Sequence, residues 1–282
     1  MPSNGTATTG NSAPMPEFLR PPVAEVALSI QFEPLTGLRV AHFGLFWAQI
    51  RDRFPKTQEQ PPVQPVVERF GARVQPPQFQ FGVGIVSPRC WFLDHDETAL
   101  LQIQTDRVIH NWRKLDRESA PYPHYGILRD KLLQEFSTFA QFVEREKIGK
   151  LVPNQCELTY INHIFLDPKA GGQLDVTRVI APWQGGYSDS FLKDPEILNA
   201  TLSFVIPGPA GPAGRLYITV APTWRMSDNR PLIVLQSICR GAPDSPDSDG
   251  AFRFLDQAHD WAVRGFASIT TPEMHSIWGR TR

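Results

Sequence analysis

The chain has 282 residues, of which 41 % are hydrophobic and 20 % charged, a composition that excludes disorder throughout and provides enough apolar side chains for a large core. Its net charge of −1 lacks the basic excess of proteins that bind nucleic-acid backbone, although it leaves room for a local basic patch. No run approaches the roughly 18 consecutive apolar residues of a membrane-spanning helix, so we expect no membrane association.

Residues 1–20 and the cysteines indicate the compartment. The first 20 residues are rich in small polar residues and proline and lack the cationic and apolar regions of a signal peptide, so we expect a disordered tail. Cys90, Cys156 and Cys239 lie far apart without the spacing of metal ligands, and each is predicted to be a small buried residue. An odd number of cysteines without a disulfide framework is typical of a reducing cytoplasm. We expect a cytoplasmic protein with no metal site and no cofactor.

The first half of the chain begins with a strand and ends with a long helix. Strict alternation of apolar and polar residues over 23–32 predicts a half-buried strand, and helical spacing predicts an amphipathic helix over 38–54. The pattern then indicates strands at 66–74, 79–83, 90–93, 99–104 and 107–113, followed by a helix from about 125 to 147. The contiguous run D-H-D-E at 94–97 is interpreted as a polar turn rather than as a metal site.

The second half repeats this order of elements. A strand at 155–165 is followed by a mixed segment at 176–187, strands at 199–206, 215–220 and 232–240, a helix at 250–269 and a short terminal helix at 271–279. The Pro- and Gly-rich run 207–214 is interpreted as a connecting loop. We predict an α+β fold of two similar halves, 21–150 and 151–282, each with antiparallel strands and a long helix packed on the sheet, which together form one compact unit.

Residues 102–113 have the pattern of a β-hairpin with a two-residue turn at 105–106. Because directly opposed residues share a face, one face is predicted to belong to the core and carries Leu101, Ile103, Val108, His110 and Trp112. The opposite face is polar except for Ile109 and carries Gln102, Gln104, Arg107, Asn111 and Arg113. Its planar donors and acceptors suit an anion, a nucleotide-like ligand or a protein partner, whereas the alternative is a solvated sheet face.

Two carboxylates extend this candidate site. Glu25 and Glu157 occupy similar positions on the first strand of each half, and a buried carboxylate there needs a cationic partner such as the arginines of the hairpin. We therefore predict a non-enzymatic binding protein that recognises a partner protein or a small anionic ligand through the polar face, and a homodimer is left open. The alternative is an enzyme that acts on a phosphate-containing or nucleic-acid substrate with His110, Glu157 and Arg113 in its site. The common nucleophile, phosphate-loop and zinc motifs are absent from the sequence.

Several short motifs together resemble an uncharacterised, sporadically distributed family of bacterial proteins. They are P-V-x-E-V at 22–26, F-x-P-L at 32–35, Q-I-Q at 102–104, N-W-R at 111–113, Y-P-x-Y at 122–125 and N-x-C-E-x-x-Y-x-N at 154–162. The resemblance covers nearly the whole chain after the tail. It implies no activity and no catalytic residues, and the patchy distribution of the family implies mobile-element or phage-defence cargo.

Overall fold

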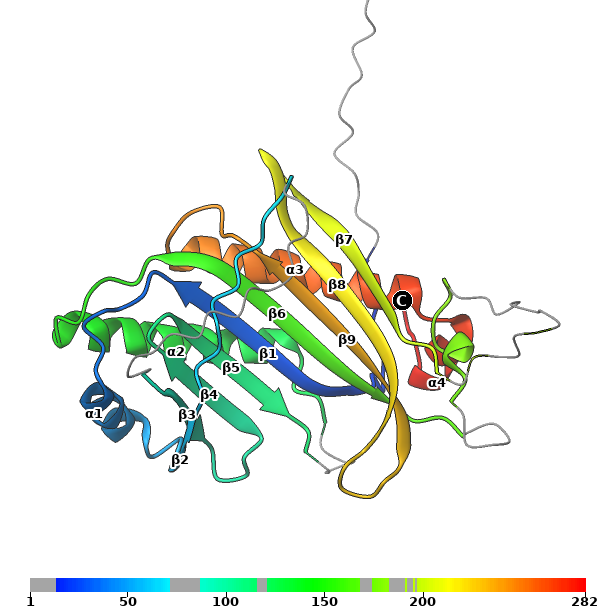
Figure 1. Cartoon of the computed structure of the whole chain (residues 1–282), viewed down its shortest axis with the longest axis horizontal. Helices are drawn as coiled ribbons and strands as arrows, with labels where there is room; N and C mark the ends of the chain where they lie inside the picture. Colours follow the sequence, from blue (N-terminus) through cyan, green and yellow to red (C-terminus); the bar gives the residue numbers. More distant parts are fainter. Residues whose placement is uncertain are drawn as a thin grey trace, which may run out of the picture.

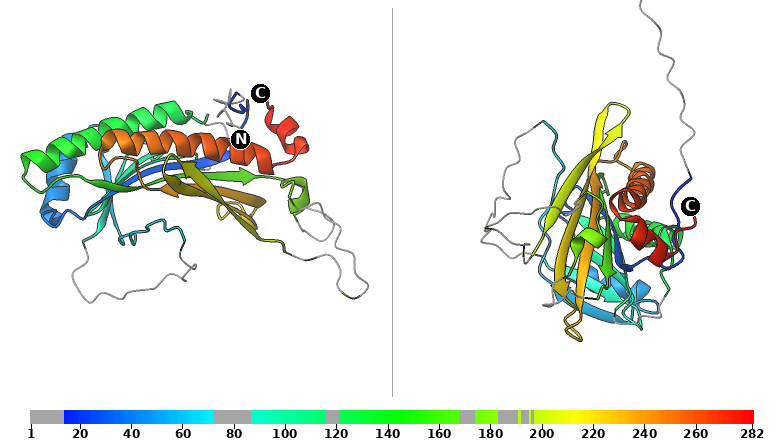
Figure 2. Two further views of the ribbon diagram at one scale, coloured as in Figure 1. Left: turned by 90° about the horizontal axis from the view of Figure 1, so that it is seen from above. Right: turned by 90° about the vertical axis from the view of Figure 1, so that its right-hand side faces the viewer.

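The computed structural model describes residues 14–71, 87–115, 121–167, 174–182, 191, 195 and 197–282. These residues form a nine-stranded antiparallel sheet with four α-helices, which confirms the predicted α+β class. The long helices α2 and α3 lie side by side on one face of the sheet (Figures 1 and 2). None of the helices in the described ranges is long and apolar enough to cross a membrane.

The strands follow the order β2-β3-β4-β5-β1-β6-β9-β8-β7 across the sheet. The central pair is β1 with β6, so the first strand of the chain lies in the middle. The bounds are β1 Val23–Phe32, α1 Val40–Ile50, β2 Lys56–Gln60, β3 Arg89–Leu93, β4 Ala99–Gln104, β5 Arg107–Arg113, α2 Tyr125–Arg145, β6 Pro153–Ile164, the 3₁₀ turn Val176–Arg178, β7 Ala200–Gly208, β8 Gly211–Trp224, β9 Pro231–Gly241, α3 Ser248–Ile269 and α4 Pro272–Trp278.

The hairpin β4–β5 has the predicted register, with Gln104 opposite Arg107 and Ile103 opposite Val108. Its core face is buried against the helices as expected. The run D-H-D-E at 94–97 lies in the turn between β3 and β4, as expected. All three cysteines are buried and free, which agrees with their prediction as small buried residues.

Two predicted segments differ from the structure. The expected strand at 66–74 is irregular over its described part, 66–71, whereas β2 forms at Lys56–Gln60, where the sequence has no apolar alternation. A charged, exposed strand of this kind suits the edge of a sheet. The run 207–214 is no loop, because β7 and β8 continue into a tight turn at 209–210. The expected strand at 79–83 lies outside the described residues.

The N-terminal segment from residue 14 onward runs beside α4. Leu19 N–H donates to the carbonyl of Gly279 at 3.1 Å, and Arg20 N–H donates to that of Trp278 at 3.0 Å. Thr281 N–H donates to the carbonyl of Glu17 at 2.9 Å. Residues 17–20, which we expected to belong to the tail, are therefore held by the C-terminal end of the chain.

Candidate functional site

The polar face of the hairpin is buried, although no helix covers it. Gln102, Gln104, Arg107 and Asn111 have exposed fractions between 4 % and 7 %. The cover is an irregular segment, residues 61–71, which we call the strap. It follows β2 and crosses the helix-free face of the sheet from β4 to β8 (Figures 1 and 2). The polar face is thus an internal interface rather than a solvated surface.

Glutamine side chains from three strands bind the main chain of the strap. Gln104 on β4 makes two bonds to Val63: its Nε2 donates to the carbonyl at 2.8 Å, and its Oε1 accepts from the N–H at 2.8 Å. Gln31 Oε1 on β1 accepts from Val66 N–H at 3.3 Å. Gln155 Oε1 on β6 accepts from the N–H of Glu68 at 3.1 Å. At Val63 and Val66 the sheet therefore binds peptide groups of the strap, whereas Glu68 is also held by its side chain.

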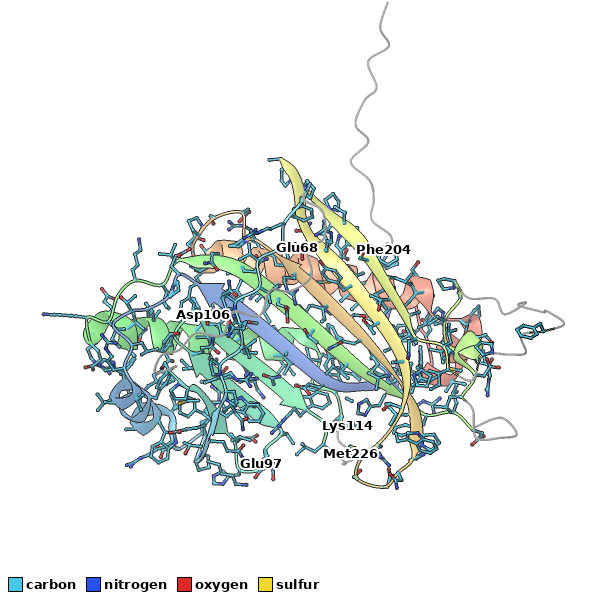
Figure 3. The ribbon with its side chains drawn as sticks, viewed as in Figure 1. Glu68, Glu97, Asp106, Lys114, Phe204 and Met226 are labelled. Carbon is cyan, nitrogen blue, oxygen red and sulfur yellow. The ribbon has the colours of Figure 1, made fainter. Side chains whose placement is uncertain are left out.

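The far end of the strap is anchored on β8. The carboxylate of Glu68 pairs with the guanidinium of Arg215, and it accepts from the hydroxyl of Tyr217 at 2.9 Å. Arg215 also donates to the carbonyl of Arg69 at 3.0 Å and lies over the ring of Phe70 at 4.5 Å. Figure 3 shows Asp106 near β4 and β5 and Glu68 toward β8, the two regions that the strap connects.

Beneath the start of the strap, a chain of hydrogen bonds fixes the side-chain amides. Arg89 Nη1 and Trp91 Nε1 each donate to Gln102 Oε1 at 2.9 Å, and Gln102 Nε2 donates to Asn111 Oδ1 at 2.6 Å. Asn111 Nδ2 then donates to Glu25 Oε1 at 2.7 Å. Burial raises the pKa of Glu25, while the Asn111 hydrogen bond and the charge of Arg113 oppose this rise. Each amide both accepts and donates, so its orientation is determined by its neighbours.

Each candidate carboxylate lies opposite an arginine on the neighbouring strand. Glu25 is the register partner of Arg113, whereas Glu157 is the register partner of Arg240 on β9 and accepts from its Nε at 2.6 Å. Of the two candidate carboxylates, Arg113 of the hairpin therefore faces Glu25 and not Glu157. Arg113 Nη2 donates to the carbonyl of Glu97 at 2.9 Å, and its buried Nε has no hydrogen-bond partner among the described residues.

A cavity of about 240 Å³ lies between the strap and the sheet. Four of the predicted site residues meet in its lining: Gln102, Arg107, Asn111 and Glu157. The sequence prediction missed Gln31, Gln155 and Arg240, which also line it. Each of them lies on a strand whose sequence alternates between apolar and polar residues, and this alternation was the signal that could have identified them. The buried Nε2 of Gln155, a residue of this lining, has no hydrogen-bond partner in the described part of the chain.

His110 does not join this site. It projects from the opposite face of β5, is fully buried, and its Nδ1 lies 2.9 Å from Oε2 of Glu135 on α2. Glu157 and Arg113 lie on the strap side, because side chains alternate between the two faces of a strand. The catalytic arrangement of His110, Glu157 and Arg113 is therefore not assembled. Among the described residues, no three His, Cys, Asp or Glu side chains form a group that could hold a metal ion.

Comparisons of the chain with protein-family models, with curated proteins and with solved structures found no match. The function is therefore inferred from the geometry of the sheet face and of its cover.

Proposed function

We propose that the chain is a non-enzymatic binding protein whose polar sheet face recognises an extended polypeptide, and that the strap is the intramolecular occupant of this surface. The observation that carries the proposal is the pair of hydrogen bonds between Gln104 and the main chain of Val63. A planar carboxamide presents a donor and an acceptor side by side, as the edge of a strand does. Main-chain hydrogen bonds do not depend on side-chain identity, so another segment that also offers a carboxylate to Arg215 and Tyr217 can take the place of the strap.

The way in which the strap is held supports exchange. Val66 and Val67 remain 41 % and 55 % exposed, so the strap contributes little apolar burial, which is the main source of stability in packed structures. Gln155, which lines the cavity beneath the strap, has an Nε2 without a hydrogen-bond partner among the described residues. A partner segment with an Asp, Glu, Asn or Gln side chain at this point would satisfy that donor. The partner protein or anionic ligand that we expect from the sequence is therefore, in this proposal, an extended polypeptide segment with such a side chain.

We also propose that the sheet consists of two similar halves, 21–150 and 151–282, related by a pseudo-two-fold axis between β1 and β6. Ala27 pairs with Thr159 in the register, and Glu25 and Glu157 lie the same number of residues before these two positions. Each carboxylate also faces an arginine on the last strand of its half. The polar face then presents related groups to both ends of an extended segment.

From the resemblance to an uncharacterised bacterial family, we also propose that the protein is part of a mobile defence-type system and that its partner is another protein of that system. The alternative of an enzyme acting on a phosphate-containing or nucleic-acid substrate is not favoured, because His110 lies on the other face of the sheet.

The proposal is tested by a variant in which residues 61–71 are replaced by Gly and Ser residues of equal number, so that the polar face is open. A fluorescent peptide with the sequence of the strap should bind this variant saturably in an anisotropy titration. It should bind the natural chain at least about tenfold more weakly, because the tethered strap competes at high effective concentration.

The matched control is the same peptide with an N-methyl group on Val63, which removes the donor to Gln104. This peptide should bind the open variant more weakly than the unmodified peptide. Equal binding of both peptides, or no saturable binding to the open variant, would contradict main-chain recognition by this face.

A further inference from the structure

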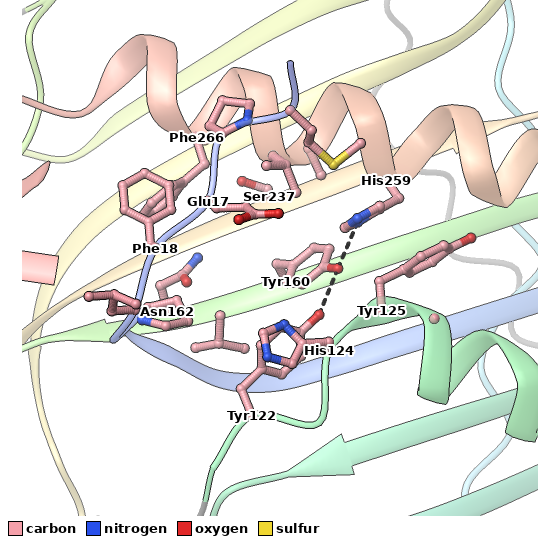
Figure 4. Close-up of a pocket in the computed structure, with 18 of the residues that line it drawn as sticks. Glu17, Phe18, Tyr122, His124, Tyr125, Tyr160, Asn162, Ser237, His259 and Phe266 are labelled. Carbon is pink, nitrogen blue, oxygen red and sulfur yellow. Dashed lines mark hydrogen bonds between the residues drawn. The ribbon is translucent and has the colours of Figure 1, made fainter. Parts of the chain in front are cut away.

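A second cavity lies on the helix-bearing face of the sheet, opposite to the strap. Its volume is about 510 Å³, within the range of roughly 300 to 1,000 Å³ that is usual for small-molecule sites. It is bordered by the start of α2, by α3, by β6 and β9, and by the N-terminal segment (Figure 4). Its walls are largely aromatic and include Phe18, Tyr122, His124, Tyr125 and Phe266.

A chain of three polar side chains lies in this cavity. The hydroxyl of Tyr122 hydrogen-bonds to that of Tyr160 at 3.1 Å, and the Tyr160 hydroxyl hydrogen-bonds to Nδ1 of His259 at 2.9 Å (Figure 4). Burial raises the pKa of Tyr122 to about 12 and lowers that of His259 to about 4. Burial also raises the pKa of Tyr160 well above its usual value. All three groups are therefore neutral near pH 7. The Tyr122 hydroxyl, at the end of this row of hydrogen bonds, can act either as a donor or as an acceptor.

The imidazole ring of His259 is held in place by neighbouring side chains. The ring of Tyr125 stacks on that of His259 with centroids 4.0 Å apart and an angle of 7°. The Tyr125 hydroxyl donates to Asp256 at 2.8 Å, and Arg129 pairs with the same carboxylate at 2.7 Å. These contacts fix the His259 ring without adding a charge to the lining, because the ion pair lies outside the residues that line the cavity.

One buried polar atom of the lining has no partner. Ser237 on β9 is 1 % exposed, and its Oγ makes no hydrogen bond among the described residues. Nearby, Nδ2 of Asn162 donates to the carbonyl of Leu235 at 3.1 Å. A buried hydroxyl without a partner costs on the order of 1 to 3 kcal/mol, so an oxygen or nitrogen atom of a ligand here would relieve a cost already present in the fold.

The charge of the lining restricts the ligand. Within the described part of the chain, the residues that line the cavity include no lysine or arginine. The one carboxylate, that of Glu17, is paired with Arg282. An anion would lose its hydration without gaining a cationic partner, which is costly.

We propose that this cavity binds a small uncharged aromatic compound that carries a hydroxyl or carbonyl group, with its ring between the aromatic walls and its polar group at Ser237 and Tyr160. This site is independent of the polar sheet face. Its polar groups come from segments far apart in the sequence, namely the region before α2, β6, β9 and α3, and they line one cavity.

The probe for this proposal is 7-hydroxycoumarin, a neutral phenol whose excitation spectrum distinguishes the phenol from its anion. The full chain should bind it saturably and should shift the bound probe toward the phenol form, because the lining contains no cation to stabilise the anion. Ser237→Ala should weaken binding about tenfold, which corresponds to the loss of roughly one hydrogen bond, while the melting temperature stays unchanged or rises. A merely structural role of Ser237 would instead lower the melting temperature.

Ser203→Ala, on the exposed part of β7, is the matched control and should bind the probe as the natural chain does. Tyr160→Phe, checked for folding by circular dichroism, should weaken binding in the same direction as Ser237→Ala. The proposal is overturned if the natural chain does not bind the probe saturably, if Ser237→Ala and Tyr160→Phe both bind it with unchanged affinity, or if the bound probe is the anion.

Discussion

Replacement of Glu135 with Ala should lower the free energy of unfolding by about 3 kcal/mol. Glu135 on α2 is 3 % exposed, contacts Nδ1 of His110 and pairs with Arg53. His110 is fully buried, and its other ring nitrogen, Nε2, already has no partner in the described part of the chain. Removal of the carboxylate would leave the imidazole without any hydrogen bond. Urea denaturation measures the loss.

Two variants separate this pairing from a general effect on α2. Glu135→Gln keeps an acceptor for His110 and should cost less than Glu135→Ala. Glu144→Ala changes an exposed carboxylate on the same helix and should stay within about 0.5 kcal/mol of the natural chain. If Glu135→Ala unfolded at the same urea concentration as Glu144→Ala, the buried pair would contribute no stability.

Stability should fall as the pH is lowered from about 6.5 toward 4, in part because of His259. Burial lowers the pKa of His259 from 6.5 to about 4, while the charges of Asp256 and Asp260 partly oppose this shift. The unfolded chain therefore binds a proton at this residue before the folded chain does, so the stabilisation is complete above pH 6.5 and is lost on acidification. The difference of pKa corresponds to on the order of 3 kcal/mol.

The pH effect is isolated by comparing melting temperatures of variants between pH 7 and pH 4. His259→Gln removes the titrating group and should show a smaller decrease than the natural chain. His95→Gln changes an exposed histidine in the β3–β4 turn and should retain the full decrease. Parallel pH profiles for the natural chain and His259→Gln would refute the assignment to His259.

The sequence predicted the elements that have a strong hydrophobic period. The alternation on β1, β5 and β6 and the stripes on α2 and α3 determine which face enters the core, and the hairpin register followed from its two-residue turn. The strap has no such period. Its path depends on hydrogen bonds to Gln31, Gln104 and Gln155, which are distant in sequence, so local patterns indicated a strand although the described residues 66–71 form none.

The candidate sites also differ in how far the sequence could predict them. Alternation alone separated Gln102 and Asn111 from the core face, and both line the cavity under the strap. It did not predict that this face would be covered, because the cover carries exposed valines and prolines that are typical of a loop. The helix-side cavity combines Tyr122, Tyr160, Ser237 and His259, whose proximity results from the order of strands in the sheet.

Amide hydrogen exchange measured by NMR tests most directly whether glutamines of the sheet hold the strap by its main chain. In the natural chain, the N–H groups of Val63, Val66 and Glu68 should exchange at least about tenfold more slowly than those of Gln64 and Val67. Gln104→Ala should accelerate exchange at Val63 more than at Glu68. Uniformly fast exchange along the strap, at the rate of an unstructured peptide, would contradict main-chain recognition by the polar face.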